Sequence, residues 1–174
     1  MNILTNKNNS KEFILYNNIL SLSRKKLFYT KFDLADTFQN RINLIFFHIS
    51  FIFIKVNQYK DKTIYKNFYQ NLFDLMFYQI EINMREIGYG DITVNKNMKY
   101  LIKSFYKILL FCENYAGKNF DQKRSFFIHY LKYNLNNNTN KIDHLIKHFN
   151  DFQTFCFDLS ADSVLKGEVK FNFN

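Results

Sequence analysis

The chain has 174 residues, which is enough for one domain with a sizeable core, and its 47% of hydrophobic residues excludes a disordered polymer. Its 2 Cys, Cys112 and Cys156, exclude a disulfide scaffold and are expected to be buried thiols in a reducing compartment. The formal net charge of +9 suits a partner with phosphate groups or anionic lipid, but AT-rich codons also favour Lys, so the charge alone does not identify a partner.

Apolar residues recur every three to four positions along nearly the whole chain, which predicts an all-α fold: a single compact domain of about six helices. Residues 1–10 are expected to be a disordered N-terminal segment without a secretory signal, and residues 11–174 the domain. In chain order, the expected helices span about 11–24, 37–59, 64–87, a stretch through 94–112 that stops before Gly117, 121–135 and 141–159, with a short turn at 160–166. The Asn-rich stretch 134–140 is expected to be an exposed loop.

Local signals place several helix ends. Ser10 is expected to cap the first helix, and Gly88 suits the left-handed cap that ends the third. Asp36, followed three residues later by Gln39, forms a capping-box pattern that starts the second helix directly after it. Apolar residues almost encircle this second helix, and their longest run, residues 42–56, is shorter than the ~20 residues of a membrane span. A central, buried helix is therefore predicted.

Enzymatic motifs are absent from the sequence, which has no glycine-rich phosphate loop, no GxSxG, no HExxH and no Cys/His cluster. We therefore expect a protein that is not an enzyme and has no cofactor. The nearest approach to a metal site consists of His144 and His148, with Asp143 and Asp151 nearby. It lacks a third and a fourth well-placed ligand, so no metal is expected there. His48, inside an apolar run, is expected to be a hydrogen-bonded core residue, although such a buried imidazole can also bind haem or a metal.

Charged residues form two lines on the expected helices. Asp74, Glu81 and Arg85 share one line of the third helix, where Glu81 and Arg85 are spaced for an ion pair, which favours structural salt bridges over a catalytic pair of carboxylates. On the fourth helix a line of lysines lies opposite the apolar side: Lys96, Lys99, Lys103 and Lys107. This basic face can track phosphates or anionic lipid head groups, or it can be a solvated face enriched by codon usage.

Several segments, in order and spacing, carry a resemblance to a known family: residues 16–24 (YNNILSLSR), 36–41 (DTFQNR), 70–77 (QNLFDLMF), 84–91 (MREIGYGD) and 94–99 (VNKNMK). With these segments the chain resembles the ubiquinol-cytochrome c chaperone family, the mitochondrial and alphaproteobacterial assembly factors for cytochrome b. Residues 165–171 resemble the closing segment of the family more weakly, and residues 117–140 depart from its pattern.

The resemblance implies a protein that binds newly made cytochrome b, near the ribosome and the membrane, and holds it until haem insertion and assembly into the reductase. Mitochondrial relatives work with a small partner protein and contact the ribosomal tunnel exit. A bacterial cytoplasmic protein at the inner face of the membrane is expected, with the matrix side of the mitochondrial inner membrane as the alternative. DNA is not an expected partner.

Two surfaces are hypothesised for this role. The first is an apolar groove that binds the client, cytochrome b, and that has charged residues beside it. Phe73 and Phe77 are the members expected to be exposed. The full set is Phe73, Met76, Phe77, Met84, Asp74, Arg85 and Asp91. Met76 and Met84 also fit a core stripe, and Arg85 to Asp91 can instead shape a turn. The second is the lysine line, for ribosome or lipid. A basic ribosome- or RNA-associated helical module with no respiratory role is the alternative function.

Overall fold

The computed structural model describes residues 10–59, 62–134 and 139–172. Within these ranges the secondary structure is helical apart from one isolated antiparallel bridge, between Leu34 and Tyr133, which confirms the all-α class. The helices are α1 (Lys11–Ser23), α2 (Leu27–Thr30), α3 (Phe38–Asn57), α4 (Lys62–Glu86), α5 (Asp91–Glu113), the 3-10 turn η2 (Tyr115–Gly117), α6 (Phe120–Tyr130), α7 (Thr139–Asp158) and α8 (Ala161–Leu165). The six expected helices correspond to α1, α3, α4, α5, α6 and α7.

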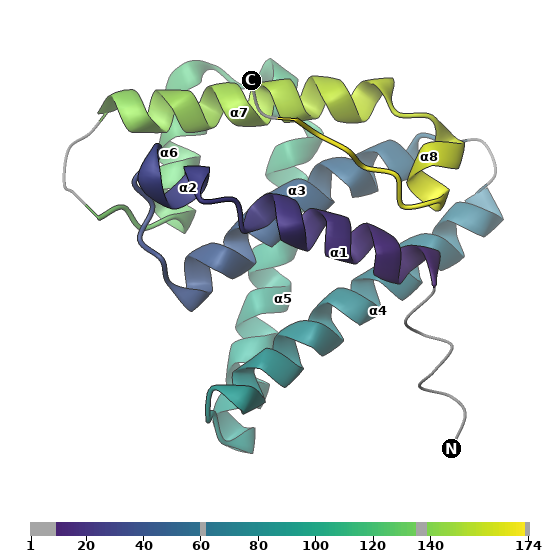
Figure 1. Ribbon diagram of the computed structural model, residues 1–174, viewed down its shortest axis with the longest axis horizontal. Coiled ribbons are helices and arrows are strands. Elements are labelled where there is room, and N and C mark those ends of the chain that lie inside the picture. Colours follow the sequence, from purple (N-terminus) through teal and green to yellow (C-terminus); the bar gives the residue numbers. More distant parts are fainter. Residues whose placement is uncertain (1–9, 60–61, 135–138, 173–174) are drawn as a thin grey trace.

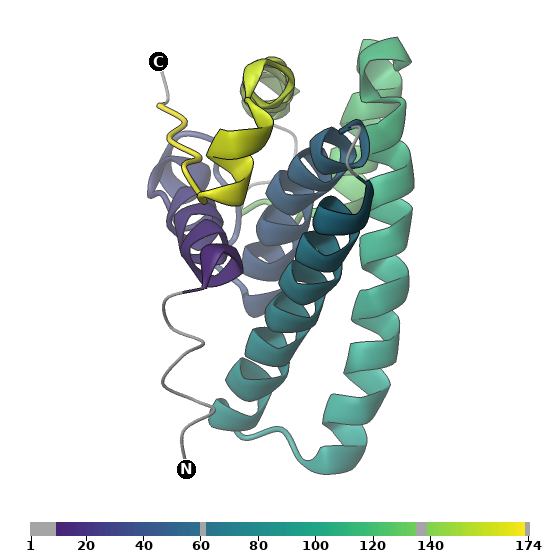
Figure 2. The ribbon, with the colours of Figure 1, turned by 90° about the vertical axis from the view of Figure 1, so that its right-hand side faces the viewer.

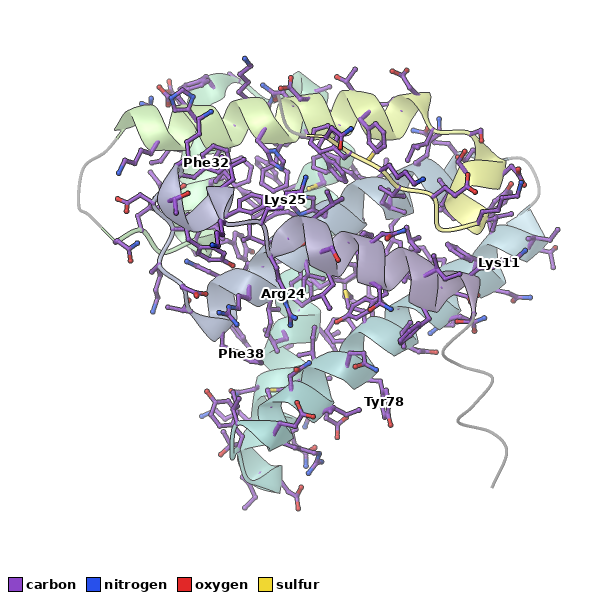
Figure 3. All side chains as sticks on the ribbon, in the orientation of Figure 1. Lys11, Arg24, Lys25, Phe32, Phe38 and Tyr78 are labelled. Atoms are coloured by element: carbon purple, nitrogen blue, oxygen red, sulfur yellow. The ribbon has the colours of Figure 1, made fainter. Side chains whose placement is uncertain are left out.

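Helix α3 lies at the centre of the fold, as its apolar circumference predicts. It packs against α1, α4, α5 and α7, so each of its sides meets another helix (Figure 1). Aromatic and aliphatic side chains fill the space between α1, α3 and α7 (Figure 3). Among the described residues, no helix is both long enough and apolar enough to span a membrane.

The long helices α4 and α5 form a hairpin whose tip extends beyond the other helices, and α5 makes up one whole edge of the molecule (Figure 2). Gly88 permits the turn between them, because it takes the left-handed conformation with φ 94° while its N–H donates to the carbonyl of Arg85. Ser10 caps α1 by accepting a hydrogen bond from the N–H of Phe13. Both predicted caps are confirmed.

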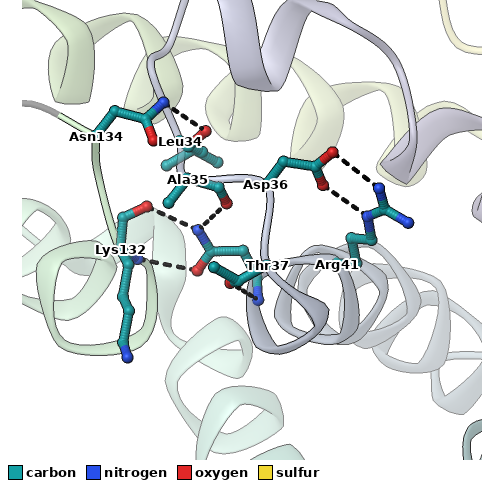
Figure 4. Close-up of polar contacts among 8 residues, drawn as sticks. Leu34, Ala35, Asp36, Thr37, Arg41, Lys132 and Asn134 are labelled. Carbon is teal, nitrogen blue, oxygen red and sulfur yellow. Dashed lines mark hydrogen bonds and ion pairs between the residues drawn. The ribbon is translucent and has the colours of Figure 1, made fainter. Parts of the chain in front are cut away.

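The predicted cap of α3 is wrong by one residue. Thr37, in an extended conformation, accepts the hydrogen bond from the N–H of Asn40 at 3.2 Å. Asp36 instead accepts two hydrogen bonds from the Arg41 guanidinium, at 2.7 and 2.8 Å (Figure 4). This pairing holds the pKa of the Asp36 carboxyl below its usual range. Asp and Thr are both common N-cap residues. Because Arg41 engages the carboxylate of Asp36, Thr37 caps the helix.

Helix α6 ends at Tyr130, earlier than the expected end near residue 135. Leu131 turns to an extended conformation, because the side chain of Asn40 holds the next residue. The Nδ2 of Asn40 donates to the carbonyl of Lys132 at 2.7 Å, and its Oδ1 accepts from the N–H of Lys132 at 2.9 Å (Figure 4). These bonds replace the helical partners that Lys132 would need to continue α6.

The termini and the Asn-rich stretch fall partly outside the described residues. Of the expected N-terminal segment only Ser10 is described, and residues 135–138 of the expected loop are not. Helix α7 already begins at Thr139, so the end of the expected loop belongs to a helix. Between α1 and α3 the chain forms the short helix α2, and the turn expected at 160–166 contains α8.

Candidate binding surfaces

The four apolar residues expected to line an open groove on α4 lie mainly in the core. Met76 and Met84 are completely buried and Phe77 is only 5% exposed, so the expected exposure of Phe77 is wrong. Phe73 is half-buried. The ring of Phe105 on α5 lies against both phenylalanines, with centroids 5.8 Å from Phe73 and 5.9 Å from Phe77. Because α5 covers this flank of α4, the four residues form no open groove, and their contact with a client stays a prediction.

The charged residues at the hairpin tip form a bridge between its helices. Arg85 lies 2.9 Å from Glu81, which confirms the predicted ion pair, and it also pairs with Asp91 in the first turn of α5. The hydrogen bonds that the Arg85 guanidinium donates to Asp91 and Glu81 raise its pKa. Asp74 accepts a hydrogen bond from Gln70 on its own helix. The ion pairs of Arg85 therefore stabilise the tip locally, whereas the Asp74 bond lies in the middle of α4, and the contact of these groups with a client stays a prediction.

The four lysines of α5 are all exposed and lie on one side of the helix, as predicted: Lys96, Lys99, Lys103 and Lys107. The opposite side is buried against α3 and α4: Val94, Leu101, Phe105, Ile108 and Cys112. The lysines are thus exposed on the side of α5 away from α3 and α4, and Figure 2 shows that α5 itself runs along one edge of the fold.

Exposed apolar residues are interleaved with these lysines. Ile92 is 87% exposed and Leu110 is 65% exposed, and they lie near opposite ends of α5; Tyr100 and Tyr106 are exposed between them. We call this set the α5 outer face: Ile92, Lys96, Lys99, Tyr100, Lys103, Tyr106, Lys107 and Leu110. The sequence holds the signal for it, because Ile92 and Leu110 fall on the lysine line at helical spacing, although the predicted basic face comprised the lysines alone.

A second surface was not predicted: a cavity of about 670 Å³ where the end of α3, the start of α4 and the last turns of α5 meet. We call it the aromatic pocket, and its lining includes Phe53, Tyr59, Tyr65, Lys66, Tyr69 and Glu113. Two ring pairs form its walls, Phe53 with Tyr69 at 3.9 Å and Tyr59 with Tyr65 at 4.6 Å between centroids.

The polar groups of the aromatic pocket keep it neutral on balance. The hydroxyl of Tyr59 donates to the carbonyl of Leu159, and burial raises the pKa of Tyr59 and of Tyr69 to about 12, so both phenols stay protonated at neutral pH. Lys66 and Glu113 carry opposite charges and are exposed. An apolar pocket with a few polar groups is the usual form of a binding site in a protein surface.

Two of the histidines, His48 and His148, belong to the core. His48 is fully buried, and its Nδ1 lies 2.6 Å from the carbonyl of Leu44, which confirms the predicted hydrogen-bonded core residue. His148 is also buried, whereas His144 is exposed. In the described part of the chain, no three His, Cys, Asp or Glu side chains come together where they could hold a metal ion. Cys112 and Cys156 are buried free thiols, as predicted, and burial raises the pKa of both.

Comparison with known proteins gives one family and one solved structure. The sequence model of the family described as "Ubiquinol-cytochrome C chaperone" matches residues 30–171. The crystal structure of the Cbp3 homolog from Brucella abortus is similar in fold, with a TM-score of 0.80 and 19% sequence identity, over 97% of this chain and 92% of that chain. No curated protein matches the chain.

Proposed function

The chain belongs to the ubiquinol-cytochrome C chaperone family, and on this premise we propose that it binds newly made cytochrome b and supports its assembly into the ubiquinol-cytochrome c reductase. The observation that carries the proposal is the family match, which covers most of the chain, residues 30–171. The role is that of a binding protein without catalysis.

The aromatic pocket supports the proposal as the place where an apolar client segment binds. A chaperone for a membrane protein needs an apolar surface that is open to the client while its own core stays closed. The pocket meets this need, because its volume of about 670 Å³ accepts a few side chains of one client helix rather than a whole helix. Its aromatic walls offer apolar contacts that do not require one particular partner sequence.

The half-buried Phe73 extends this surface. The aromatic residues of α4 recur every four positions from the pocket into the core: Tyr65, Tyr69, Phe73 and Phe77. Phe73 follows Tyr69 by one turn, and its ring lies 5.9 Å from that of Tyr106 on the α5 outer face. A client helix that places side chains in the aromatic pocket can therefore also contact Phe73, which is the most accessible member of the expected apolar set.

We propose that the chain acts on newly made cytochrome b at the inner face of a bacterial membrane, and the matrix side of the mitochondrial inner membrane is the alternative location. The basic ribosome- or RNA-associated module remains a second candidate, because the lysines and tyrosines of the α5 outer face are both exposed and both suit RNA. The two functions differ in the partner, which is cytochrome b in the first and the ribosome or RNA in the second.

Recovery of cytochrome b with the tagged chain tests the proposal. Cells that make both proteins are lysed in mild detergent, the chain is captured, and cytochrome b is measured by immunoblot. We expect cytochrome b in the captured fraction and no enrichment of an unrelated membrane protein of similar hydrophobicity. Capture of folded chain without cytochrome b would contradict the proposal, and capture of ribosomal RNA alone would favour the second candidate.

A further inference from the structure

The α5 outer face is a long, straight surface that no other described segment of the chain covers. Helix α5 has 23 residues and is therefore about 34 Å long. Its inner side packs on α3 and α4, while its outer side forms one edge of the molecule (Figure 2). Such an edge can rest along its whole length on a flat partner without any change in the fold.

The charge of this face has one sign. Between Asp91 and Glu113, which begin and end α5, the helix has no acidic residue. Asp91 pairs with Arg85, and Glu113 lines the aromatic pocket. The four lysines between them therefore present a positive surface whose natural complement is a negative one. A second copy of the chain would bring lysines against lysines, which disfavours a dimer through this face.

The exposed aliphatic residues distinguish among negative partners. Phosphate groups of RNA pair with lysines and RNA bases stack on tyrosines, but neither gives a contact to Ile92 or Leu110. In a lipid interface every member of the set has a place. Aliphatic side chains enter the acyl boundary, tyrosines lie at head-group depth, and lysines extend their stems to keep the ammonium groups at the lipid phosphates.

From this combination we propose that the α5 outer face docks the chain on an anionic lipid bilayer, with α5 parallel to the membrane plane and Ile92 and Leu110 inserted at its two ends. The aromatic pocket lies at the edge of this face, because the last turns of α5 line it. Docking thus places the pocket beside the membrane surface. The inference goes beyond the proposed function, since lipid binding needs no cytochrome b.

The chain has no Trp, so a single introduced Trp reports its own surroundings. Leu110→Trp places the probe on the α5 outer face, and Phe157→Trp places a matched probe on α7, where Phe157 is also exposed. The purified variants are mixed with vesicles of phosphatidylcholine and phosphatidylglycerol, or of phosphatidylcholine alone. We expect a blue shift, and quenching by brominated acyl chains, for Leu110→Trp with the anionic vesicles only, and no change for Phe157→Trp.

Two pairs of substitutions separate lipid from RNA as the partner. Lys99→Gln with Lys103→Gln is expected to lower vesicle binding by on the order of tenfold, with a steep dependence on salt. Ile92→Ser with Leu110→Ser is expected to lower vesicle binding as well, while leaving any binding to a single-stranded RNA unchanged. All four residues are exposed, and circular dichroism checks that each variant is folded.

Three results would overturn the inference: no spectral change of Leu110→Trp on anionic vesicles, a larger change of Phe157→Trp, or vesicle binding unaffected by Ile92→Ser with Leu110→Ser. RNA binding that depends on the lysines, together with the last of these results, would assign the face to RNA. Because the vesicle experiment contains no cytochrome b, its failure leaves the proposed function standing, and the reverse is also true.

Discussion

The Nε2 atoms of His48 and His148 lie 3.3 Å apart in the core and join α3 to α7. Since the carbonyl of Leu44 can only accept a hydrogen bond, Nδ1 of His48 carries the proton that it donates to that carbonyl. Nε2 of His48 is then the acceptor, and the Nε2–H of His148 donates to it. Burial lowers the pKa of both imidazoles below their ordinary value of 6.5, so each ring is neutral and the pair holds one fixed set of tautomers.

This pair predicts a loss of stability in weak acid. A histidine with a lowered pKa in the folded state binds more protons when unfolded, so the free energy of unfolding falls as the pH drops below the unfolded pKa of 6.5. We expect a slope of about 1.4 kcal/mol per pH unit for each histidine below about pH 6. Urea unfolding at a series of pH values measures the slope. His148→Gln should reduce it, whereas the exposed His144→Gln should not, and equal slopes in all three proteins would refute the assignment.

Asn40, in the first turn of α3, is predicted to be a polar residue whose loss destabilises the fold. Its side chain is completely buried and supplies the acceptor for the N–H of Lys132. Asn40→Ala leaves that N–H without its partner and should lower the free energy of unfolding by about 2 kcal/mol. Asn134→Ala, which removes an amide that is exposed, is the control and should cost clearly less. Chemical denaturation compares the two, and an equal cost would contradict the account of why α6 ends at Tyr130.

The two glycines with positive φ predict different costs. Gly88, with φ 94°, has open space around the position of a Cβ. Gly88→Ala should therefore lower the free energy of unfolding only by the energy of holding Ala in the left-handed conformation, about 1–2 kcal/mol. Gly167, with φ 74°, would place its Cβ 2.8 Å from Cγ2 of Ile14 and 2.9 Å from the backbone N of Leu15. Gly167→Ala should therefore destabilise the protein more, because the C-terminal segment must move off α1. Thermal unfolding of the two variants checks the order, and a larger loss for Gly88→Ala is the contrary result.

The aromatic pocket predicts a binding defect without a folding defect. Tyr65 is half-buried in its wall, so Tyr65→Lys places a charge where an apolar client side chain would lie. We expect the cytochrome b recovered with the captured chain to fall by on the order of tenfold. Ile128→Lys adds the same charge at an exposed position of α6 and should leave recovery unchanged. An unchanged recovery with folded Tyr65→Lys would remove the pocket as the client site.

The features predictable from the sequence are those set by one helix alone. The central position of α3 follows from the apolar residues around its whole circumference. The lysine side of α5 follows from the helical spacing of its lysines. The burial of Phe77 was not predictable, because it depends on which flank of α4 the next helix covers. The end of α6 depends on the bonds between Asn40 and Lys132, which are 92 positions apart in the chain, and the aromatic pocket needs the ends of three helices together. Such contacts leave no local pattern.

We propose above all that the chain supports assembly of the ubiquinol-cytochrome c reductase through cytochrome b. The most direct measurement is the amount of cytochrome b and of assembled reductase in cells from which the gene has been deleted. We predict that both fall on deletion, that the wild-type chain restores both, and that messenger RNA for cytochrome b is unchanged. Normal amounts of cytochrome b and of assembled reductase in the deletion cells would contradict the account.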